Sequence, residues 1–140
     1  MPTYPARIEL ESQGHTDVID ITDRVRDAVK RSGVRSGLAC VFVPGATGGV
    51  TTIEFEPGCV ADLATAFERV APSRGDYEHE RRWHDGNGHS HVRAALLGPS
   101  LTVPIVEHEL TLGTWQQIVF GDFDNRSRRR SLVLQIVGDA

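Results

Sequence analysis

The segment SLTVPIVEHELTLGTWQQIVF, residues 100–120, decides the fold class of this chain of 140 residues. Within it, runs rich in aliphatic and β-branched residues at 101–106, 109–112 and 116–120 are separated by only a few residues. Such spacing is typical of antiparallel strands joined by short connections. A further run of this kind lies at 132–137. The C-terminal part of the chain therefore predicts an antiparallel sheet.

The preceding part of the chain adds strands and helices to this sheet. Alternating or continuous apolar residues predict strands at 7–11, 18–21, 38–43 and 50–55, with 18–21 as the hairpin partner of 7–11. Apolar residues at helical spacing predict helices at 22–32, 60–70 and 90–97. Thr22 is the expected N-cap of the first helix and Gly33 its end. The polar segment 72–88 is expected to be an irregular loop.

This order of elements predicts an α+β fold with a mainly antiparallel, β-sandwich-like sheet and two or three helices. The length fits a single domain spanning residues 1–140. A doubly wound nucleotide-binding fold is disfavoured, because strands and helices do not alternate and the chain has no G-x-G-x-x-G or Walker lysine loop.

Charge and hydropathy narrow the range of partners. The formal net charge is −4, which argues against a general nucleic-acid-binding protein. No run approaches the ~18 consecutive apolar residues of a membrane span, and the N-terminus does not resemble a signal peptide. A cytoplasmic location is therefore expected. Cys40 and Cys59 are expected to be free thiols.

Several motifs resemble those of the YjbQ-like family, which is also named the secondary thiamine-phosphate synthase family. Ser100-Leu-Thr-Val-Pro-Ile105 followed by Gly113-Thr-Trp-Gln116 is similar to the family signature. Tyr77-Glu78-His79 resembles its Tyr-x-His, and the segment 87–93 resembles its histidine block. The arginine run 128–130 matches the basic run before its last strand.

This resemblance, which covers residues 7–138, implies a homotrimer of compact α+β subunits. It also implies a weak thiamine-phosphate synthase activity, which joins a pyrimidine diphosphate to a thiazole phosphate and releases pyrophosphate. The ligand would then be a small phosphorylated heterocycle. The chain departs from the family pattern at Gly45 and Ala46, which stand where relatives have a histidine and a hydroxyl residue, and at His108, which replaces a glycine.

His91 and Glu54 are the candidate catalytic residues. His91 matches the histidine block, and its imidazole can accept or donate a proton near pH 7. Glu54, at the end of the strand predicted at 50–55, could act as a general base, bind a metal or orient a histidine. The alternative for Glu54 is a surface carboxylate without a role.

The candidate substrate-binding residues combine an aromatic ring, side chains with both donor and acceptor groups, and arginines. Arginine forks suit phosphate oxygens, whereas the alternative for the arginine run is a solvated cluster beside Asp122 and Asp124. Trp115 could stack on a heterocycle, or instead belong to the core or a trimer contact. The full set is Trp115, Gln116, Arg93, Arg128, Arg130, Thr47 and Asn87.

The histidines of segment 79–91 form a candidate metal site. Imidazoles are common ligands of zinc, and Asp85 could complete such a site. The predicted metal ligands are His79, His84 and His89, and the predicted cofactor is a divalent metal, either zinc or magnesium. Their spacing matches no standard metal motif, so the alternative is a solvated polar loop.

Two functions remain open from the sequence. The first is a thiamine-phosphate synthase-like transferase, in which arginines hold the diphosphate and His91 assists proton movement. The second is a non-enzymatic trimer that binds a small molecule or a metal, which the replacement of the family histidine by Gly45 favours. A hydrolase of a phosphorylated metabolite ranks last, because it would need a nucleophile or a metal-activated water. The chain has no Gly-x-Ser-x-Gly motif and no clear cysteine–histidine pairing.

Overall fold

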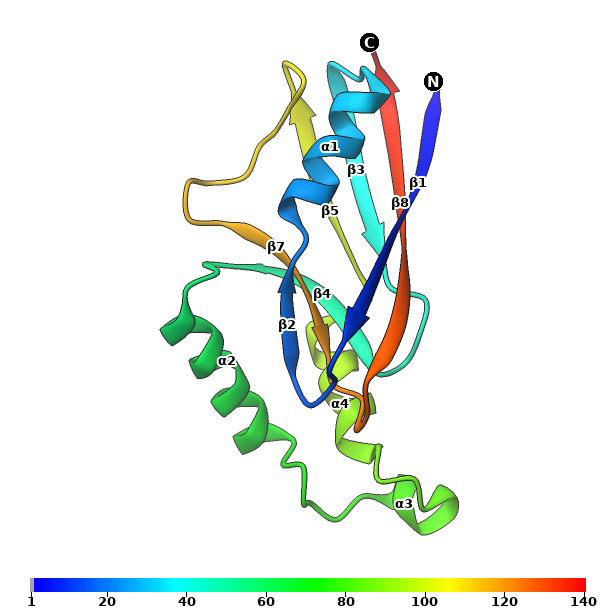
Figure 1. Cartoon of the computed structure of the whole chain (residues 1–140), viewed down its shortest axis with the longest axis vertical. Helices are drawn as coiled ribbons and strands as arrows, with labels where there is room; N and C mark the ends of the chain where they lie inside the picture. The colour runs from blue at the N-terminus through cyan, green and yellow to red at the C-terminus, as the bar shows by residue number, and fades with distance from the viewer. Residues whose placement is uncertain (1) are drawn as a thin grey trace.

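The computed structural model describes residues 2–140, which form two curled antiparallel sheets and four helices (Figure 1). The strands are β1 (Thr3–Ser12), β2 (Asp17–Asp20), β3 (Ser36–Phe42), β4 (Gly48–Ile53), β5 (Ser100–Val106), β6 (Glu109–Leu110), β7 (Gln117–Asp122) and β8 (Arg128–Asp139). The helices are α1 (Thr22–Ser32), α2 (Pro57–Val70), α3 (Glu78–Trp83) and α4 (Gly88–Leu97).

The five-stranded sheet has the order β1-β8-β3-β5-β6, and the three-stranded sheet has the order β2-β7-β4. The predicted α+β fold with a mainly antiparallel, sandwich-like arrangement is confirmed. Cys40 and Cys59 are free, as expected. No helix within residues 2–140 is long and apolar enough to cross a membrane.

The predicted hairpin between segments 7–11 and 18–21 is wrong. β1 pairs with β8 along its whole length, whereas β2 pairs with β7 in the other sheet. Between them, Gly14, His15 and Thr16 all have positive φ angles and turn the chain from one sheet to the other. A side chain at Gly14 would collide with the carbonyl oxygens of Asp124 and Arg126, so only glycine fits this crossing.

The segment 72–88, predicted to be a loop, contains the short helix α3. Its acidic residues lie in the first turn and its arginines in the last turn, which matches the helix dipole. His84 then ends the helix in a left-handed conformation with φ of 53°. The structure therefore has one helix more than the upper limit of the sequence prediction.

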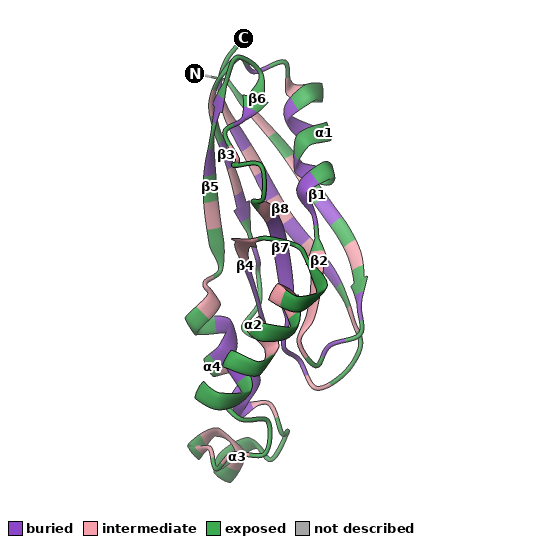
Figure 2. Cartoon of the chain, turned by 90° about the vertical axis from the view of Figure 1, so that its left-hand side faces the viewer, coloured by how far each residue is buried: buried purple, intermediate pink, exposed green. Residues whose placement is uncertain are grey.

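The core lies between the two sheets and under α1. β8 alternates so that Leu132, Leu134 and Ile136 face the core, and α1 adds Val25 and Val29. β7 is buried over almost its whole length, as Figure 2 shows. Burial of these apolar side chains removes them from water and is the main favourable contribution to folding.

The two ends of the molecule differ in character. The termini and α1 lie at one end, and α3 and α4 lie at the opposite end (Figure 1). A second apolar cluster packs α2 and α4 together there. It contains Ala94 of α4, Phe67 of α2 and Phe123 after β7, and the two phenylalanine rings have a centroid distance of 4.9 Å. This end also receives the loop 44–47 and the connection between β7 and β8, so it gathers polar residues from distant parts of the sequence.

Candidate metal site

Three side chains at the helical end converge in a way that suits a metal ion. His79 comes from α3, Asp85 from the connection that follows it, and His91 from α4. One ligand atom from each lies within 4.8 Å of those of the other two. The two imidazole rings have a centroid distance of 4.5 Å. A single ion could therefore contact all three side chains after small adjustments.

His91 is held in one tautomer by the backbone. Its Nδ1 lies 2.9 Å from the carbonyl oxygen of Ala46. A carbonyl oxygen can only accept a hydrogen bond, so Nδ1 carries the proton and donates it. The lone pair is then on Nε2, which is the nitrogen left to bind a metal. This arrangement is common among metal-binding histidines, because the second hydrogen bond fixes the ring orientation.

His79 places a buried nitrogen between two carboxylates. Its Nδ1 lies 3.2 Å from Asp85 Oδ1 and 3.5 Å from Glu80 Oε1. These distances allow an ion pair, but the directions are not those of a hydrogen bond. Nδ1 is the one buried side-chain nitrogen or oxygen in residues 2–140 that lacks a hydrogen-bond partner. Such an atom is costly to leave unpaired, so a bound cation beside it would be stabilising.

Asp85 is held by its neighbours while remaining half exposed. Its Oδ1 accepts a hydrogen bond of 3.1 Å from the backbone N–H of Asn87. Its own carbonyl oxygen accepts one of 2.7 Å from Nδ2 of Asn125. Gly86 follows with φ of 72°, and this left-handed residue turns the chain toward α4. The carboxylate is therefore positioned, and the site stays open to solvent on its side.

Asp124 is buried, and its carboxylate accepts hydrogen bonds from several side chains near this cluster. Its Oδ2 accepts hydrogen bonds from Thr47 Oγ1 at 3.0 Å and from Arg128 Nη1 at 2.7 Å. Its Oδ1 is 3.4 Å from Asn87 Nδ2. Burial raises the pKa of this carboxyl group, but the hydrogen bonds from Thr47 and Asn87 and the two nearby arginines lower the pKa by more. The group is therefore ionised at neutral pH.

Arg130 forms a second buried pair in the same network. Its Nε and Nη2 each donate to an oxygen of Asp122 at 2.8 Å, and Nη2 also donates to Thr47 Oγ1 at 2.7 Å. The hydrogen bonds to Asp122 raise the pKa of this guanidinium. Thr47 thus links the strands β7 and β8 to the loop whose carbonyl group orients His91.

Arg93, another predicted substrate-binding residue, links α4 to α2. Arg93 in α4 donates to Glu68 at 2.6 Å, to the carbonyl oxygen of Ala71 at 2.9 Å and to Thr16 at 2.8 Å. All three guanidinium nitrogens are occupied, and the side chain is buried. Arg93 therefore has a structural role within this subunit, and Arg128 likewise holds Asp124.

Two of the three predicted metal ligands lie outside the cluster. His84 is exposed and ends α3. His89 is buried, with its ring centroid 6.4 Å from that of Tyr77, and burial lowers its pKa, assisted by the charge of Arg93. The predicted catalytic residue His91 instead joins His79 in the cluster. Glu54 is exposed beyond the end of β4.

The structure does not bring Trp115 and Gln116 together with the histidines within one subunit. Gln116 pins its own loop, since it accepts a hydrogen bond from Gly113 N–H and donates one to Thr52 Oγ1, both at 3.0 Å. It borders a groove between β4 and β5 that no histidine lines. Trp115 is 73% exposed. Within residues 2–140, these two candidate substrate-binding residues therefore lie apart from the histidine cluster.

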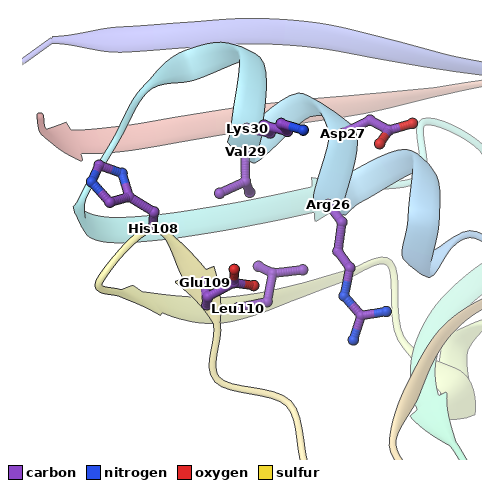
Figure 3. A pocket seen from close by; sticks show the side chains of 7 residues that line it. All are labelled: Arg26, Asp27, Val29, Lys30, His108, Glu109 and Leu110. Carbon is purple, nitrogen blue, oxygen red and sulfur yellow. The ribbon is translucent and has the colours of Figure 1, made fainter.

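A separate cleft of about 460 Å³ lies between α1 and the β5–β6 turn (Figure 3). Val29 and Leu110 form its apolar part, and none of the predicted site residues lines it. Its charged residues, Arg26, Asp27, Lys30 and Glu109, are of both signs. This mixture selects no single class of ligand, and the cleft lies at the end of the molecule opposite α3 and α4 (Figure 1).

Sequence reasoning did not assign roles to Glu80, to the carbonyl group of Ala46 or to the pair Asp122 and Asp124. A backbone carbonyl leaves no sequence signal. The two aspartates did carry one, because acidic residues at 122 and 124 precede arginines at 128 and 130 by short intervals. That pattern indicates internal charge pairing, which the structure now shows.

The fold and the cluster define a class: a small α+β protein of two antiparallel sheets with a histidine-rich site at its helical end. The family model described as "UPF0047 protein YjbQ-like" matches residues 6–139, and the chain belongs to this family.

Relatives from distant organisms share nearly the whole length. A UPF0047 protein of Archaeoglobus fulgidus is 36% identical over 126 residues, which are 90% of this chain and 96% of the relative. The UPF0047 protein YugU of Bacillus subtilis is 32% identical over 133 residues, 94% of this chain and 97% of the relative. The family resemblance seen in the sequence is therefore confirmed.

Solved structures agree with the fold. The crystal structure of an uncharacterised YjbQ/UPF0047 family protein of Clostridium acetobutylicum has a TM-score of 0.86 and 37% identity, and covers 94% of this chain and 99% of that one. A hypothetical protein of Aeropyrum pernix has a TM-score of 0.90 and 29% identity, and covers 99% of this chain and 100% of that one.

Proposed function

We propose that this protein binds a divalent transition metal, zinc or a similar ion, through His79, Asp85 and His91. The observation that carries the proposal is the convergence of their ligand atoms within 4.8 Å. The buried and unpaired Nδ1 of His79 and the tautomer of His91 fixed by Ala46 support it. Both features prepare a nitrogen lone pair for a cation.

The donor set favours zinc over magnesium. Two imidazoles and one carboxylate match the mixed nitrogen and oxygen ligands of zinc, whereas magnesium prefers an octahedral shell of oxygens. Three protein ligands leave a fourth position for water or a substrate, as in catalytic zinc sites. A metal in such a position lowers the pKa of bound water and polarises a bound carbonyl or phosphoryl group.

The thiamine-phosphate synthase activity implied by the family resemblance has less support from the geometry. Its diphosphate would need open arginines, but all three nitrogens of Arg93 are occupied, and Arg128 and Arg130 are each paired with a buried aspartate. Growth of a thiamine auxotroph that depends on this protein and on His91 would favour the transferase over a binding protein.

The trimeric assembly implied by the resemblance is also a proposal. The outer face of β3 and β5 has no helix over it and exposes Leu38, Phe42 and Val106. In the sheet, Leu38 lies between Pro104 and Val137, and Phe42 lies beside Val133. An apolar face of this kind suits contact with further copies of the chain.

The metal proposal is tested by calorimetric titration of the purified protein with Zn²⁺. We expect one site per chain in the wild type and a loss of affinity of at least about 100-fold in His79→Ala and in His91→Ala, since each removes a ligand. His84→Ala is the matched control, because this exposed histidine is close in sequence but outside the cluster. Equal affinity in all four proteins would rule the site out.

A further inference from the structure

Arg130 keeps one nitrogen free although its side chain is only 7% exposed. Its Nε and Nη2 are occupied by Asp122 and Thr47. Nη1 makes no hydrogen bond with residues 2–140. It is also not among the buried unpaired atoms, of which His79 Nδ1 is the single case in these residues. Nη1 therefore still reaches solvent, while the rest of the guanidinium is fixed.

The free nitrogen faces the space beside Gly45. Apart from its chain neighbours Pro44 and Ala46, a Cβ atom built on Gly45 would meet only Arg130 Nη1 within 4 Å, at 3.4 Å. The glycine itself is exposed. An external ligand atom can therefore enter this space and accept a hydrogen bond from a donor whose position is already set by Asp122.

This space adjoins the metal site along the chain. Gly45 precedes Ala46, and neighbouring Cα atoms are about 3.8 Å apart. The carbonyl oxygen of Ala46 is 2.9 Å from His91 Nδ1. In the loop 44–47, Gly45 thus lies beside Arg130 Nη1, and the next residue, Ala46, is hydrogen-bonded to the metal-binding His91. The metal site and the space beside Nη1 are therefore connected through consecutive residues of one loop.

We propose that the site takes a small molecule with a phosphate or carboxylate group, whose oxygens bind both the metal ion and Arg130 Nη1. The proposal rests on the metal-binding function above. A guanidinium only donates, so its partner must be an acceptor, and anionic oxygens are the strongest acceptors. A divalent cation with an open position also prefers such oxygens. Gly45 is the residue that leaves room for them.

The test uses Co²⁺ as a metal with a visible spectrum. Inorganic phosphate and acetate are titrated separately into the Co²⁺-loaded wild type, with KCl to match ionic strength. We expect either anion to change the spectrum at saturable concentration. In Gly45→Ala, the added methyl occupies the space beside Nη1, and anion affinity should fall about tenfold, as for the loss of one charge-assisted hydrogen bond. Co²⁺ affinity should change less than about threefold.

Gly33→Ala is the control for backbone strain, because Gly33, like Gly45, has a positive φ (70° against 159°) and its added methyl would meet no atom within 4 Å. The anion that binds more tightly identifies the ligand group as phosphate or carboxylate. Absence of any spectral change with both anions, or wild-type affinity in Gly45→Ala, would overturn the proposal.

A measurement on the metal-free protein distinguishes failure of the anion site from failure of the proposed metal-binding function. Phosphate is titrated into the apo protein while the backbone amide signals of Gly45 and Ala46 are followed by NMR. If phosphate shifts these signals but the protein does not bind Co²⁺ when it is added, the anion site is retained and the metal site is rejected. Co²⁺ binding without anion effects at Gly45 would retain the metal site and reject the anion site.

Discussion

Thr47 Oγ1 lies 3.0 Å from Asp124 Oδ2, and this contact joins the loop that orients His91 to the end of β7. The same hydroxyl accepts a hydrogen bond from Arg130. Thr47 is one of the predicted substrate-binding residues, but it is buried, and its hydroxyl already donates to Asp124 and accepts from Arg130. Its role is to set the position of the loop, and the site above depends on that position.

Replacement of Asp124 by alanine should therefore lower both stability and metal affinity. It leaves Arg128 without its partner and removes acceptors from Thr47 and Asn87. Loss of one partner of a buried ion pair costs about 3–5 kcal/mol, and we expect a loss near the lower end because Arg128 can turn toward water. Urea denaturation measures the change. Asp23→Ala, at an exposed pair with Arg26, should change the unfolding free energy by less than about 0.5 kcal/mol.

Acid should destabilise the protein in part through this carboxylate. The pKa of Asp124 is lower in the folded protein than its ordinary value of 3.8, so the unfolded chain binds its proton more readily. The resulting stability is fully present above about pH 5 and is lost as the pH falls through the folded-state pKa. Denaturation curves between pH 7 and about pH 3 should show a smaller acid-dependent loss in Asp124→Asn than in the wild type. An equal loss in both would assign the acid sensitivity to other carboxylates.

The parts of the fold that sequence predicted are those with local causes. Gly33 ends α1 in a left-handed conformation with φ of 70°, as a C-terminal glycine should. The pairing of β2 with β7 is not local: it joins Asp17 to Asp122 across the chain, and the crossing at Gly14 depends on the backbone of Asp124 and Arg126. No spacing near β2 carries that information.

The candidate site likewise combines a local feature, which the sequence predicted, with contacts between distant residues, which it did not. Histidine content singled out segment 79–91, but which histidines meet depends on the turn at His84 and Gly86, and on a carbonyl group from residue 46. His89 is two residues from His91 in α4, and two residues along a helix turn a side chain to nearly the opposite face. The sequence therefore located the region, but it named His84 and His89 as partners of His79, whereas His91 is the histidine that joins it.

The exposed face of β3 gives a prediction about assembly. Phe42 is 43% exposed and lies beside Val133 on the outer side of the sheet. If this face contacts other copies, Phe42→Arg places a charge in the interface and should shift the species seen by sedimentation velocity from trimer to monomer. Phe55→Arg is the control, because Phe55 is equally exposed but lies beyond the end of β4. A monomeric wild type would contradict the expected trimer.

Gly45→His offers a prediction in which two affinities move in opposite directions. The family resemblance implies a histidine at this position, and apart from Pro44 and Ala46 only Arg130 Nη1 lies within 4 Å of a Cβ atom built here. A third imidazole beside His79 and His91 should raise Zn²⁺ affinity by about tenfold or more, since each added ligand strengthens a zinc site. The same ring fills the opening toward Nη1 and should weaken phosphate binding to the metal-loaded protein.

Calorimetry with Zn²⁺ and then phosphate measures both affinities, and Gly45→Gln controls for size without an imidazole. If both affinities fall, the loop cannot direct a side chain at residue 45 toward the metal. In that case, glycine at this position has not replaced a metal ligand by an anion site.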